Sequence, residues 1–548
     1  MRLRDVRIPP TQNLEPATLR DFSGGLNTVD DDLNLDRRFA PVMTNCHFGV
    51  DRGVSVRWGT RLFANINNLT TSGLTIRAIN TEYYNNSLIV VGSSGEVFRL
   101  FGDGSGSVIW GYGNWSPTEF VSFAQFNGEL IICNGVDKPL IVNTSFDVAY
   151  LQDLASETNI NTPVCRYVIS SNRYLIMAGD PQNPDRVYIS ARDTSGTWPG
   201  DPDPNDATYI DLGSSLKDGG VIKGLADFRG RVIVAYAGGC IIGTTGIYDE
   251  AGAHVPDFND SVEQYGAVSH RGIQSYGDDL LMMDRVGVPS LKRTVFTGTI
   301  RPERVSDLVD NGMSALINQL TFLTMEDQIF SVYDQVEGMF MFFIPNRNAD
   351  ATETVGFGFT FRTNLRVSAW HRIEGWNFTC GTRSAEGRIF FGDKNGKIWI
   401  KGSELDPIYA DFVSDSTINS GEGIAIDWEW ELAWADFQSR LNTKTTRYIS
   451  FDTRGRADFT VEAYLDRIET NKDGVRTPHL SMTFVGGSLL GYGDGDQPFG
   501  GGRISSDERY YAWPAKFKLM KLRLFGSTTD KLSFHSISFL YRKGNTQR

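Results

Sequence analysis

The chain has few of the residue patterns that carry chemistry in proteins. Its 548 residues include only five cysteines and six histidines. The cysteines are widely scattered without a C-x-x-C pair, and the histidines stand singly without an H-E-x-x-H motif. These absences argue against a disulfide framework and against a zinc site. We therefore expect the cysteines to be buried, reduced thiols, and we expect no metal site.

Motifs for nucleotide binding and hydrolysis are also missing. The sequence has no G-x-S-x-G elbow, and its glycine-rich segments do not satisfy G-x-G-x-x-G. Paired carboxylates such as Glu429 and Glu431 could serve a glycosidase, but 66 acidic residues produce such pairs by chance. The sequence therefore predicts a protein that is not an enzyme, without catalytic residues and without a cofactor.

Long apolar runs and positive charge are scarce as well. The longest apolar runs, such as 339–344, are far too short to cross a bilayer, and the N-terminus lacks the apolar region of a signal peptide. Lysine and arginine number 53 against 66 acidic residues, which gives a net charge of -13. Proteins that grip nucleic-acid phosphates usually have the opposite balance. We expect no membrane insertion and no sequence-specific binding of DNA.

Glycine and aromatic residues, in contrast, are abundant. The chain has 57 glycines, and 12% of its residues are aromatic. This combination is typical of short aromatic-rich strands joined by tight turns. A length of 548 residues exceeds what one hydrophobic core usually organises, so we expect several domains or one large domain built from repeats. The composition predicts an all-β fold.

A turn followed by an apolar strand recurs seven times between Tyr84 and Gly402. The turns contain, in order, Asn86, Gly128, Asn172, Gly230, Asp278, Gly338 and Gly387. The first and the last are six intervals apart, a mean of about 50 residues, close to the ~40–50 residues of a four-stranded propeller blade. Residues 61–405 are therefore predicted to form a β-propeller of six or seven blades. A set of stacked β-sandwiches with coincidentally spaced hairpins is the alternative.

Two stretches interrupt this regular spacing. Residues 180–215 are rich in proline, aspartate and glycine, which predicts a long loop with many turns. Between Arg301 and Thr321 apolar residues follow the three-and-four spacing of one helical face. We expect an inserted helix there, the one substantial helix of the chain, with Ser306 as its N-cap.

The pattern changes after Ser403, where long alternating strands replace the repeated hairpins. From Ile424 to Trp434 apolar residues alternate with alanine, aspartate and glutamate, as in an antiparallel strand with one packed face. Residues 459–465, 520–524 and 537–541 repeat this alternation. Residues 406–548 are therefore predicted to form a β-sandwich, or platform, domain.

The first 60 residues carry three short motifs in a fixed order. They are a G-G-L-N element, an A-x-x-x-x-N segment and an R-x-G-T segment, formed by Gly24, Gly25, Leu26 and Asn27, by Ala40 and Asn45, and by Arg57, Gly59 and Thr60. In this order they resemble the opening of the tail nozzle, or tail-stabilisation, proteins of short-tailed, podovirus-type bacteriophages. Stretches at 268–288, 369–372 and 391–399 are similar to the same family, so the resemblance extends to about residue 400.

The resemblance implies a virion structural protein of the phage tail, made in the bacterial cytoplasm. Such a protein assembles into a ring, expected to be a hexamer, below the portal and adaptor. The ring would conduct and retain the genome, pass double-stranded DNA without sequence-specific binding, and anchor neighbouring adaptor, portal-side and tail-fibre proteins. Residues 1–60 would be an extended docking segment of the platform, with the eight G-G-L-N, Asn45 and R-x-G-T residues as candidate assembly residues.

The acidic balance suits a conduit for DNA, because a like-charged wall repels phosphates. Candidates for an acidic lumen are Asp30, Asp31, Asp32, Asp201, Asp203 and Asp206. Ordinary solubility explains the net charge equally well.

The alternative function is a carbohydrate-binding or glycan-hydrolysing propeller with an accessory sandwich domain. The aromatic residues Trp110, Tyr112, Trp115 and Trp198 could stack on sugar rings. In a chain rich in sheet such residues are more often structural. A ring-forming protein without hydrolase activity would favour the nozzle, and a glycan-binding monomer would favour the alternative.

Overall fold

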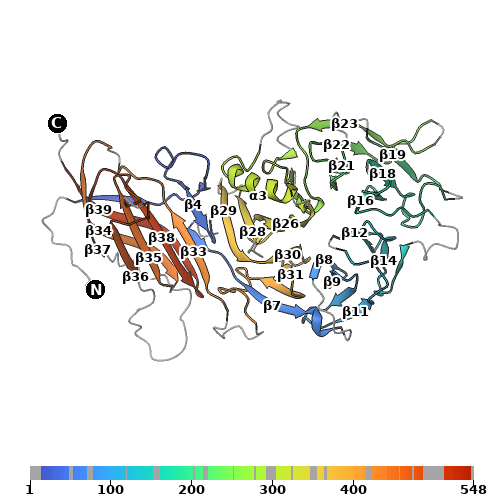
Figure 1. Ribbon diagram of the computed structural model, residues 1–548, viewed down its shortest axis with the longest axis horizontal. Coiled ribbons are helices and arrows are strands. Elements are labelled where there is room, and N and C mark those ends of the chain that lie inside the picture. Colours follow the sequence, from blue (N-terminus) through green and yellow to red (C-terminus); the bar gives the residue numbers. More distant parts are fainter. Residues whose placement is uncertain are drawn as a thin grey trace.

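The chain folds almost entirely into β-sheet (Figure 1). The computed structural model describes residues 14–48, 53–70, 78–118, 120–151, 161–201, 204–213, 220–250, 252–276, 279–291, 304–322, 325–345, 354–362, 367–414, 423–437, 440–455, 457–471, 474–484 and 511–544. All five cysteines are buried and free, as expected. No helix within these ranges is long and apolar enough to cross a membrane.

Seven sheets stand around a common axis and form a β-propeller (Figure 1). The innermost strand of each sheet packs against the innermost strands of its two neighbours. These strands are β8 (Ala78–Tyr84), β12 (Ser122–Phe126), β16 (Tyr167–Ser171), β20 (Gly224–Phe228), β24 (Ile273–Tyr276), β26 (Phe330–Asp334) and β30 (Phe378–Arg383). Because β30 lies beside β8, the ring is closed. The predicted propeller is confirmed, with seven blades.

Each predicted turn follows the innermost strand of one blade. In four turns both central residues have positive φ, namely Asn85 and Asn86, Asn127 and Gly128, Asn172 and Arg173, and Arg229 and Gly230. Two-residue turns with this conformation match the twist of the strands that they join, and asparagine and glycine adopt it most readily. The turn residues at 277–278 lie outside the described part of the chain.

The first four blades are regular four-stranded antiparallel sheets. Their outer strands are β9 (Ser87–Gly92), β10 (Val97–Leu100), β11 (Gly106–Trp110), β13 (Glu129–Cys133), β14 (Leu140–Val142), β15 (Val148–Tyr150), β17 (Tyr174–Ala178), β18 (Arg186–Ile189), β19 (Thr208–Asp211), β21 (Arg231–Ala235), β22 (Gly239–Thr244) and β23 (Asp257–Glu263). The stretch of residues 180–215, predicted as a long loop with many turns, also contains the strands β18 and β19. Its turns connect the outer strands of the third blade.

The fifth blade is the least regular. The short helix η2 (His270–Gly272) precedes β24, which pairs with β25 (Asp279–Met282). Isolated bridges join Leu281 to Ser290 and Pro289 to Arg304, and residues 292–303 lie outside the described part. The predicted helix follows this blade in the chain.

The predicted helix is confirmed as α3 (Asp310–Phe322), the only α-helix of the described residues. It begins later than expected, and Ser306 does not cap it. The Ser306 hydroxyl instead accepts a hydrogen bond from the backbone N–H of Val288 at 2.7 Å. Through this bond the buried Ser306 holds the segment before α3 against the fifth blade. Residues 301–303 lie outside the described part.

An N-terminal strand completes the seventh blade. β30, β31 (Ile389–Asp393) and β32 (Lys397–Lys401) are its inner strands, and β7 (Thr60–Asn65) pairs with β32 at the rim. The short helices η1 (Ile66–Asn68) and η3 (Glu326–Gln328) lie in connections after β7 and before β26. Because both ends of the propeller sequence share one sheet, the ring opens only if the β7–β32 ladder breaks.

The sixth blade continues directly into the C-terminal domain. After β26 it contains β27 (Met339–Pro345), β28 (Thr354–Arg362) and β29 (Val367–Trp376). The N-terminal strand β4 (Val42–Thr44) pairs with β29 on one side and with β33 (Ile426–Glu431) on the other. The sheet then proceeds through β38 (Met520–Thr528), β35 (Phe459–Leu465) and β36 (Leu480–Phe484). Beside β29 lies β2 (Gly25–Leu26), which in turn pairs with β3 (Phe39–Ala40). One eleven-stranded sheet therefore spans both domains.

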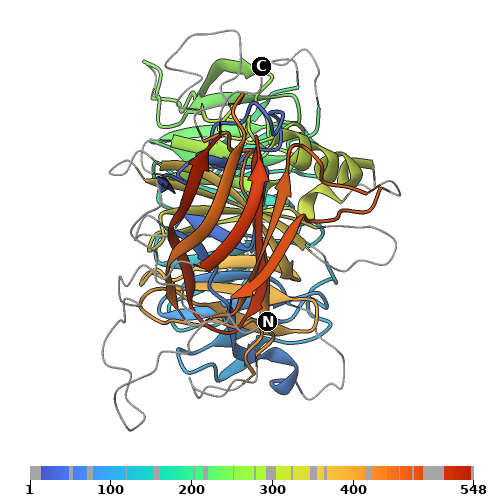
Figure 2. The same ribbon diagram turned by 90° about the vertical axis from the view of Figure 1, so that its left-hand side faces the viewer.

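A second sheet packs on this one and forms the expected sandwich (Figure 2). Its strands are β37 (Tyr511–Phe517), β34 (Lys444–Gly455), β39 (Leu532–Lys543), β6 (Val54–Val56), β5 (Cys46–Phe48) and β1 (Glu15–Leu19). Trp430, Trp513 and Phe534 of the sandwich share a single apolar core with Trp370 of the sixth blade and Met313 of α3. The predicted C-terminal sandwich is confirmed. Its Gly-rich stretch 486–502 lies outside the described residues.

Candidate functional site

The R-x-G-T motif lies in the joint between the propeller and the sandwich. The side chain of Arg57 is only 4% exposed. Its guanidinium donates hydrogen bonds to both carboxylate oxygens of Asp411, at 2.6 and 2.8 Å, and lies 4.3 Å from the ring centre of Trp376. Asp411 also accepts from the Trp376 indole at 2.8 Å. This buried, bidentate pair links the N-terminal segment to the end of β29 and to the segment after β32.

Asn45 connects this pair to β29 and to β33. Its Oδ1 accepts hydrogen bonds from Arg57 Nε at 2.8 Å and from the backbone N–H of Glu374 at 2.9 Å. Its Nδ2 donates to the backbone oxygen of Asp427 at 2.7 Å. The residue has a φ of 54°, a conformation that asparagine tolerates better than most residues. We name Asn45, Arg57, Trp376 and Asp411 the joint cluster.

Two backbone segments approach each other closely at Gly59 and Thr60. A Cβ atom on Gly59 would lie 1.9 Å from the backbone oxygen of Ala410. The fully buried Thr60 accepts a hydrogen bond from the backbone N–H of Phe412 at 3.1 Å through its hydroxyl. Local packing therefore explains both the glycine and the threonine of the R-x-G-T motif.

The G-G-L-N element packs against the sixth blade. A Cβ atom on Gly24 would meet the Phe39 ring at 2.5 Å, and Gly25, with a φ of 70°, lies against the backbone of Trp370. Leu26 is part of the shared core, and the buried Asn27 caps the following turn through its own side chain. The motif residues thus build contacts within one chain, and their role in assembly stays a prediction.

The acidic loop that contains Asp30, Asp31 and Asp32 lies beside the sandwich. Asp32 forms an ion pair with the buried Lys521 at 2.5 Å. Asp30 accepts a hydrogen bond from the Asn27 amide at 2.9 Å, whereas Asp31 is exposed. Asp32 therefore has a structural contact within the chain, and Asp30 and Asp31 are better candidates for a charged outer surface.

The second acidic stretch lies in the third blade of the propeller, whereas the first lies beside the sandwich. Asp201 is buried and accepts a hydrogen bond from the backbone N–H of Trp198 at 2.7 Å. Burial raises the pKa of Asp206, but hydrogen bonds from the Arg192 N–H and from the Tyr248 and Tyr174 hydroxyls outweigh it and lower that pKa. Asp203 lies outside the described residues. Within a single chain, the acidic residues Asp30 to Asp32 therefore do not lie near Asp201 and Asp206.

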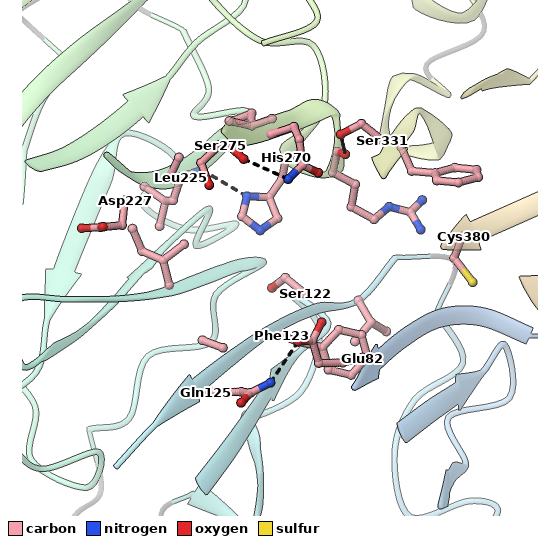
Figure 3. A pocket seen from close by; sticks show the side chains of 18 of the residues that line it. Glu82, Ser122, Phe123, Gln125, Leu225, Asp227, His270, Ser275, Ser331 and Cys380 are labelled. Carbon is pink, nitrogen blue, oxygen red and sulfur yellow. Dashed lines mark hydrogen bonds between the residues drawn. The ribbon is translucent and has the colours of Figure 1, made fainter. Parts of the chain in front are cut away.

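A cavity of about 590 Å³ lies on the axis of the propeller (Figure 3). Residues from all seven innermost strands line it. Exposed side chains such as Gln125, Asp227 and Ser275 lie toward the hairpin turns, and buried ones such as Ser122 and Cys380 lie at the opposite end. The cavity therefore opens toward the turns. Its size falls within the ~300–1,000 Å³ range of small-molecule pockets.

Glu82 supplies a carboxyl group that titrates near neutral pH. Gln125 Nε2 donates to Glu82 Oε1 at 3.1 Å and to the backbone oxygen of Tyr83 at 2.8 Å. Burial raises the pKa of Glu82 to about 7, against the opposing effect of the Gln125 hydrogen bond. A carboxyl group with this pKa is present in both its neutral and its ionised form near neutral pH.

His270 supplies a neutral hydrogen-bond donor. Its Nδ1 accepts from the backbone N–H of Leu225 at 3.2 Å, so the neutral ring carries its proton on Nε2. Burial, aided by the charge of Arg271, lowers the pKa of His270 to about 4. Figure 3 shows the ring turned into the cavity. Near neutral pH the imidazole is therefore an N–H donor and not a cation.

The cavity can bind a small polar ligand through this neutral donor, the carboxyl groups and several amides and hydroxyls. Among the described residues there is no group of three or more His, Cys, Asp or Glu side chains that could hold a metal ion. Sequence reasoning missed the cavity residues. One signal was present, because Gln125, Ser170, Asp227 and Ser275 each stand two residues before a predicted turn.

The aromatic residues considered for sugar stacking do not form one platform. Trp115 and Trp198 are buried at 3% and 0% exposure, and Trp110 packs edge-on against Tyr150. Tyr112 is exposed. The core covers Trp115 and Trp198, which supports a structural role for these two residues.

Comparisons with known proteins give no family. No protein-family model and no curated protein matches the chain. Among solved structures, the PorZ surface component of the type-IX secretion system of Porphyromonas gingivalis is 9% identical, with a TM-score of 0.36 over 59% of this chain and 36% of PorZ. YCF48, solved with a D1 peptide, is 12% identical, with a TM-score of 0.35 over 63% of this chain and 94% of that one. The designed Ika8 protein is 10% identical, with a TM-score of 0.35 over 62% and 99%.

Proposed function

We propose that the protein is a virion structural protein that forms the tail nozzle ring of a short-tailed phage. In this role it lies below the portal and adaptor, conducts and retains the genome, and anchors neighbouring tail proteins. The proposal rests on the ordered N-terminal motifs. It is supported by their location, because Asn45, Arg57, Gly59 and Thr60 bind the propeller to the sandwich. A chain that shares these motifs would share the same two-part body.

The connection between the propeller and the sandwich suits a subunit that must transmit force. Domains joined by a linker and a small polar interface usually move relative to one another. Here the sixth blade and the sandwich share one eleven-stranded sheet and one apolar core. A ring built from such subunits would transmit force without a hinge between propeller and platform.

DNA would pass through the ring and not through the propeller. The axial cavity of about 590 Å³ has the size of a small-molecule pocket, and a duplex cannot thread it. The proposed lumen is therefore the central hole of an assembly of several copies. This requires a homo-oligomer, for which a hexamer is the expected order.

Mass photometry and negative-stain microscopy of the purified chain test the proposal directly. We expect closed rings whose mass is six times the 61.0 kDa of one chain, and no hydrolase activity on glycans. A protein that stays monomeric at micromolar concentration, both alone and with its neighbouring tail proteins, would contradict it.

Deletion of residues 1–19 tests the proposed docking role of the N-terminal segment. β1 pairs only with β39 at the edge of the sandwich, so its removal leaves every propeller ladder intact. We expect unchanged propeller melting with loss of ring formation or of virion incorporation. Deletion of residues 1–40 is less selective, because it also removes Phe22 and Leu26 from the shared core. Normal assembly of the shorter deletion would refute the docking role.

A carbohydrate-binding or glycan-hydrolysing propeller is the second candidate. The axial cavity favours it, since Glu82 and Asp227 place two carboxyl groups among amides and hydroxyls. A monomer that binds or cleaves glycans, and loses this property in Glu82→Gln, would support this candidate over the nozzle.

A further inference from the structure

The axial cavity contains a carboxyl group without a cationic neighbour. Burial and the Gln125 amide are the two influences on the Glu82 carboxyl, and no arginine or lysine of the described chain contributes. Arg271, which also lines the cavity, donates instead to the backbone oxygens of Asp327 at 2.7 Å and of Thr379 at 3.3 Å. Its charge is therefore held at the boundary between the sixth and seventh blades.

Hydrogen-bond acceptors line the cavity both beside Glu82 and across from it. Gln125 uses its Nε2 for Glu82 and for the backbone, which leaves its Oε1 as an acceptor. Asp227, from β20, accepts from the Ser171 hydroxyl and lines the open end of the cavity. Figure 3 shows Glu82 and Gln125 side by side, with Asp227 across the cavity from them. An ammonium group has three donors and no acceptor, so such a set of acceptors matches it.

We infer that the axial cavity binds a small aliphatic amine, with Glu82 as the counter-charge of its ammonium group and Gln125 and Asp227 as further acceptors. The amine site does not require His270, whose Nε2–H would donate to a hydroxyl or carbonyl oxygen only in a ligand that carries one. A metal ion fits less well, because three or more carboxylate, imidazole or thiolate ligands do not converge within the described residues. The inference is independent of the proposed nozzle function.

Binding of the amine is coupled to the release of a proton from Glu82. The other titratable or charged groups that line the cavity are Asp227 of β20, His270 and Arg271 of η2, and Cys380 of β30. His270 stays neutral and Arg271 stays charged between pH 6 and pH 8, while burial keeps the pKa of Cys380 above its usual value. Because the pKa of Glu82 is about 7, an incoming ammonium group displaces a proton from the protonated fraction. We expect affinity to fall about tenfold from pH 8 to pH 6.

Isothermal titration of the full chain with 1,4-diaminobutane tests the inference, and 1,4-butanediol is the uncharged control. We expect saturable binding of the diamine alone, with proton release at pH 7 that is measured in two buffers of different ionisation enthalpy. Glu82→Gln keeps the shape of the side chain and should abolish binding. Glu386→Gln, at an exposed hairpin of the seventh blade, is the matched control and should bind as wild type does.

Three results would overturn the inference. They are no binding of the diamine at millimolar concentration, equal binding of the diol, and diamine binding without proton release. All three are measured on the unmodified chain, so a Glu82→Gln protein that fails to fold does not protect the inference. Equal binding by a folded Glu82→Gln variant would also exclude Glu82 as the counter-charge.

Discussion

At the residue scale, the joint cluster adds one buried ion pair to the sheet and the apolar core that the two domains share. Arg57 and Asp411 are separated by 354 positions in the chain, yet they form a bidentate pair. The R-x-G-T motif identified Arg57, but Asp411 could not be chosen from the many other aspartates of the sequence. A single sequence shows which residue types are present and does not show which distant segments meet.

The joint pair should dominate the cost of mutations in this region. We expect Arg57→Met to lower the free energy of unfolding by about 3–5 kcal/mol, because it leaves the Asp411 charge buried without its partner. The double variant Arg57→Met with Asp411→Leu should recover part of this loss. Denaturant unfolding measures both.

The exposed pair of Arg388 and Glu386, 3.7 Å apart, provides the control for the joint pair. Arg388→Met should change stability by less than about 0.5 kcal/mol, since exposed pairs contribute little. An Arg57→Met protein as stable as the Arg388→Met protein would show that the joint does not depend on its ion pair.

Glu82 should give the propeller a measurable pH dependence. Its pKa is about 7 in the fold against 4.5 for an ordinary glutamate, so the folded chain binds more protons than the unfolded chain between these pH values. Its contribution to stability is therefore present below pH 4.5 and is lost as pH rises through 7. We expect Glu82→Gln to gain stability over wild type across this window, by up to about 3 kcal/mol.

Unfolding curves at pH 5 and pH 8 measure this gain. Glu386→Gln again serves as the control and should show no such difference, because its carboxyl is exposed to solvent. A constant difference between Glu82→Gln and wild type at both pH values would contradict the raised pKa.

At the element scale, local turn chemistry carries most of the information about the propeller. The hairpins were found because asparagine and glycine in two-residue turns favour positive φ, and each turn lies beside an apolar strand. The helix was found by its apolar spacing, but its start was misplaced. Ser306 lies before the helix, where its hydroxyl accepts from the Val288 N–H and donates to the carboxylate of Asp310, the first helical residue. Alternation of apolar and polar residues revealed the sandwich strands.

Pairings between distant elements left no comparable trace in the sequence. Nothing local indicates that β7 closes the seventh blade, or that β4 lies between β29 and β33. The axial cavity is missed for the same reason, since its residues come from seven separate strands. Only their regular position before each turn gave a hint.

The hairpin interpretation predicts a specific sensitivity at Gly128. This residue has a φ of 80°, and the nearest atom to an added Cβ is 3.8 Å away, so conformation and not space is limiting. We expect Gly128→Ala to destabilise the protein by about 1–2 kcal/mol. Gly102→Ala, at an open position without positive φ, should be nearly neutral. Equal thermal stability of the two variants would argue against the turn as a determinant of the blade.

At the scale of the whole molecule, the propeller and the sandwich act as one body, and the remaining question is which surface faces a lumen. Of the acidic candidates, Asp32 and Asp201 are engaged by Lys521 and by the Trp198 N–H. Replacing either with lysine would damage the fold. Asp30 and Asp31 are exposed, so their charge can be reversed with less structural effect.

If this loop lines the conduit, phage carrying Asp30→Lys with Asp31→Lys should assemble normally and eject DNA more slowly at low salt. The lysines would replace repulsion of phosphates by attraction, and the attraction weakens as salt increases. The Debye length shrinks from ~30 Å at about 0.01 M salt to ~8 Å at about 0.15 M, so the delay should shrink over this range. Asp260→Lys, at a highly exposed position on β23, is the control for a charge change elsewhere on the surface. Ejection rates that match wild type at every salt concentration would remove this loop from the lumen, and the acidic charge would then serve solubility there. A delay that persists unchanged at high salt would instead indicate an altered subunit contact, because charge screening does not affect packing.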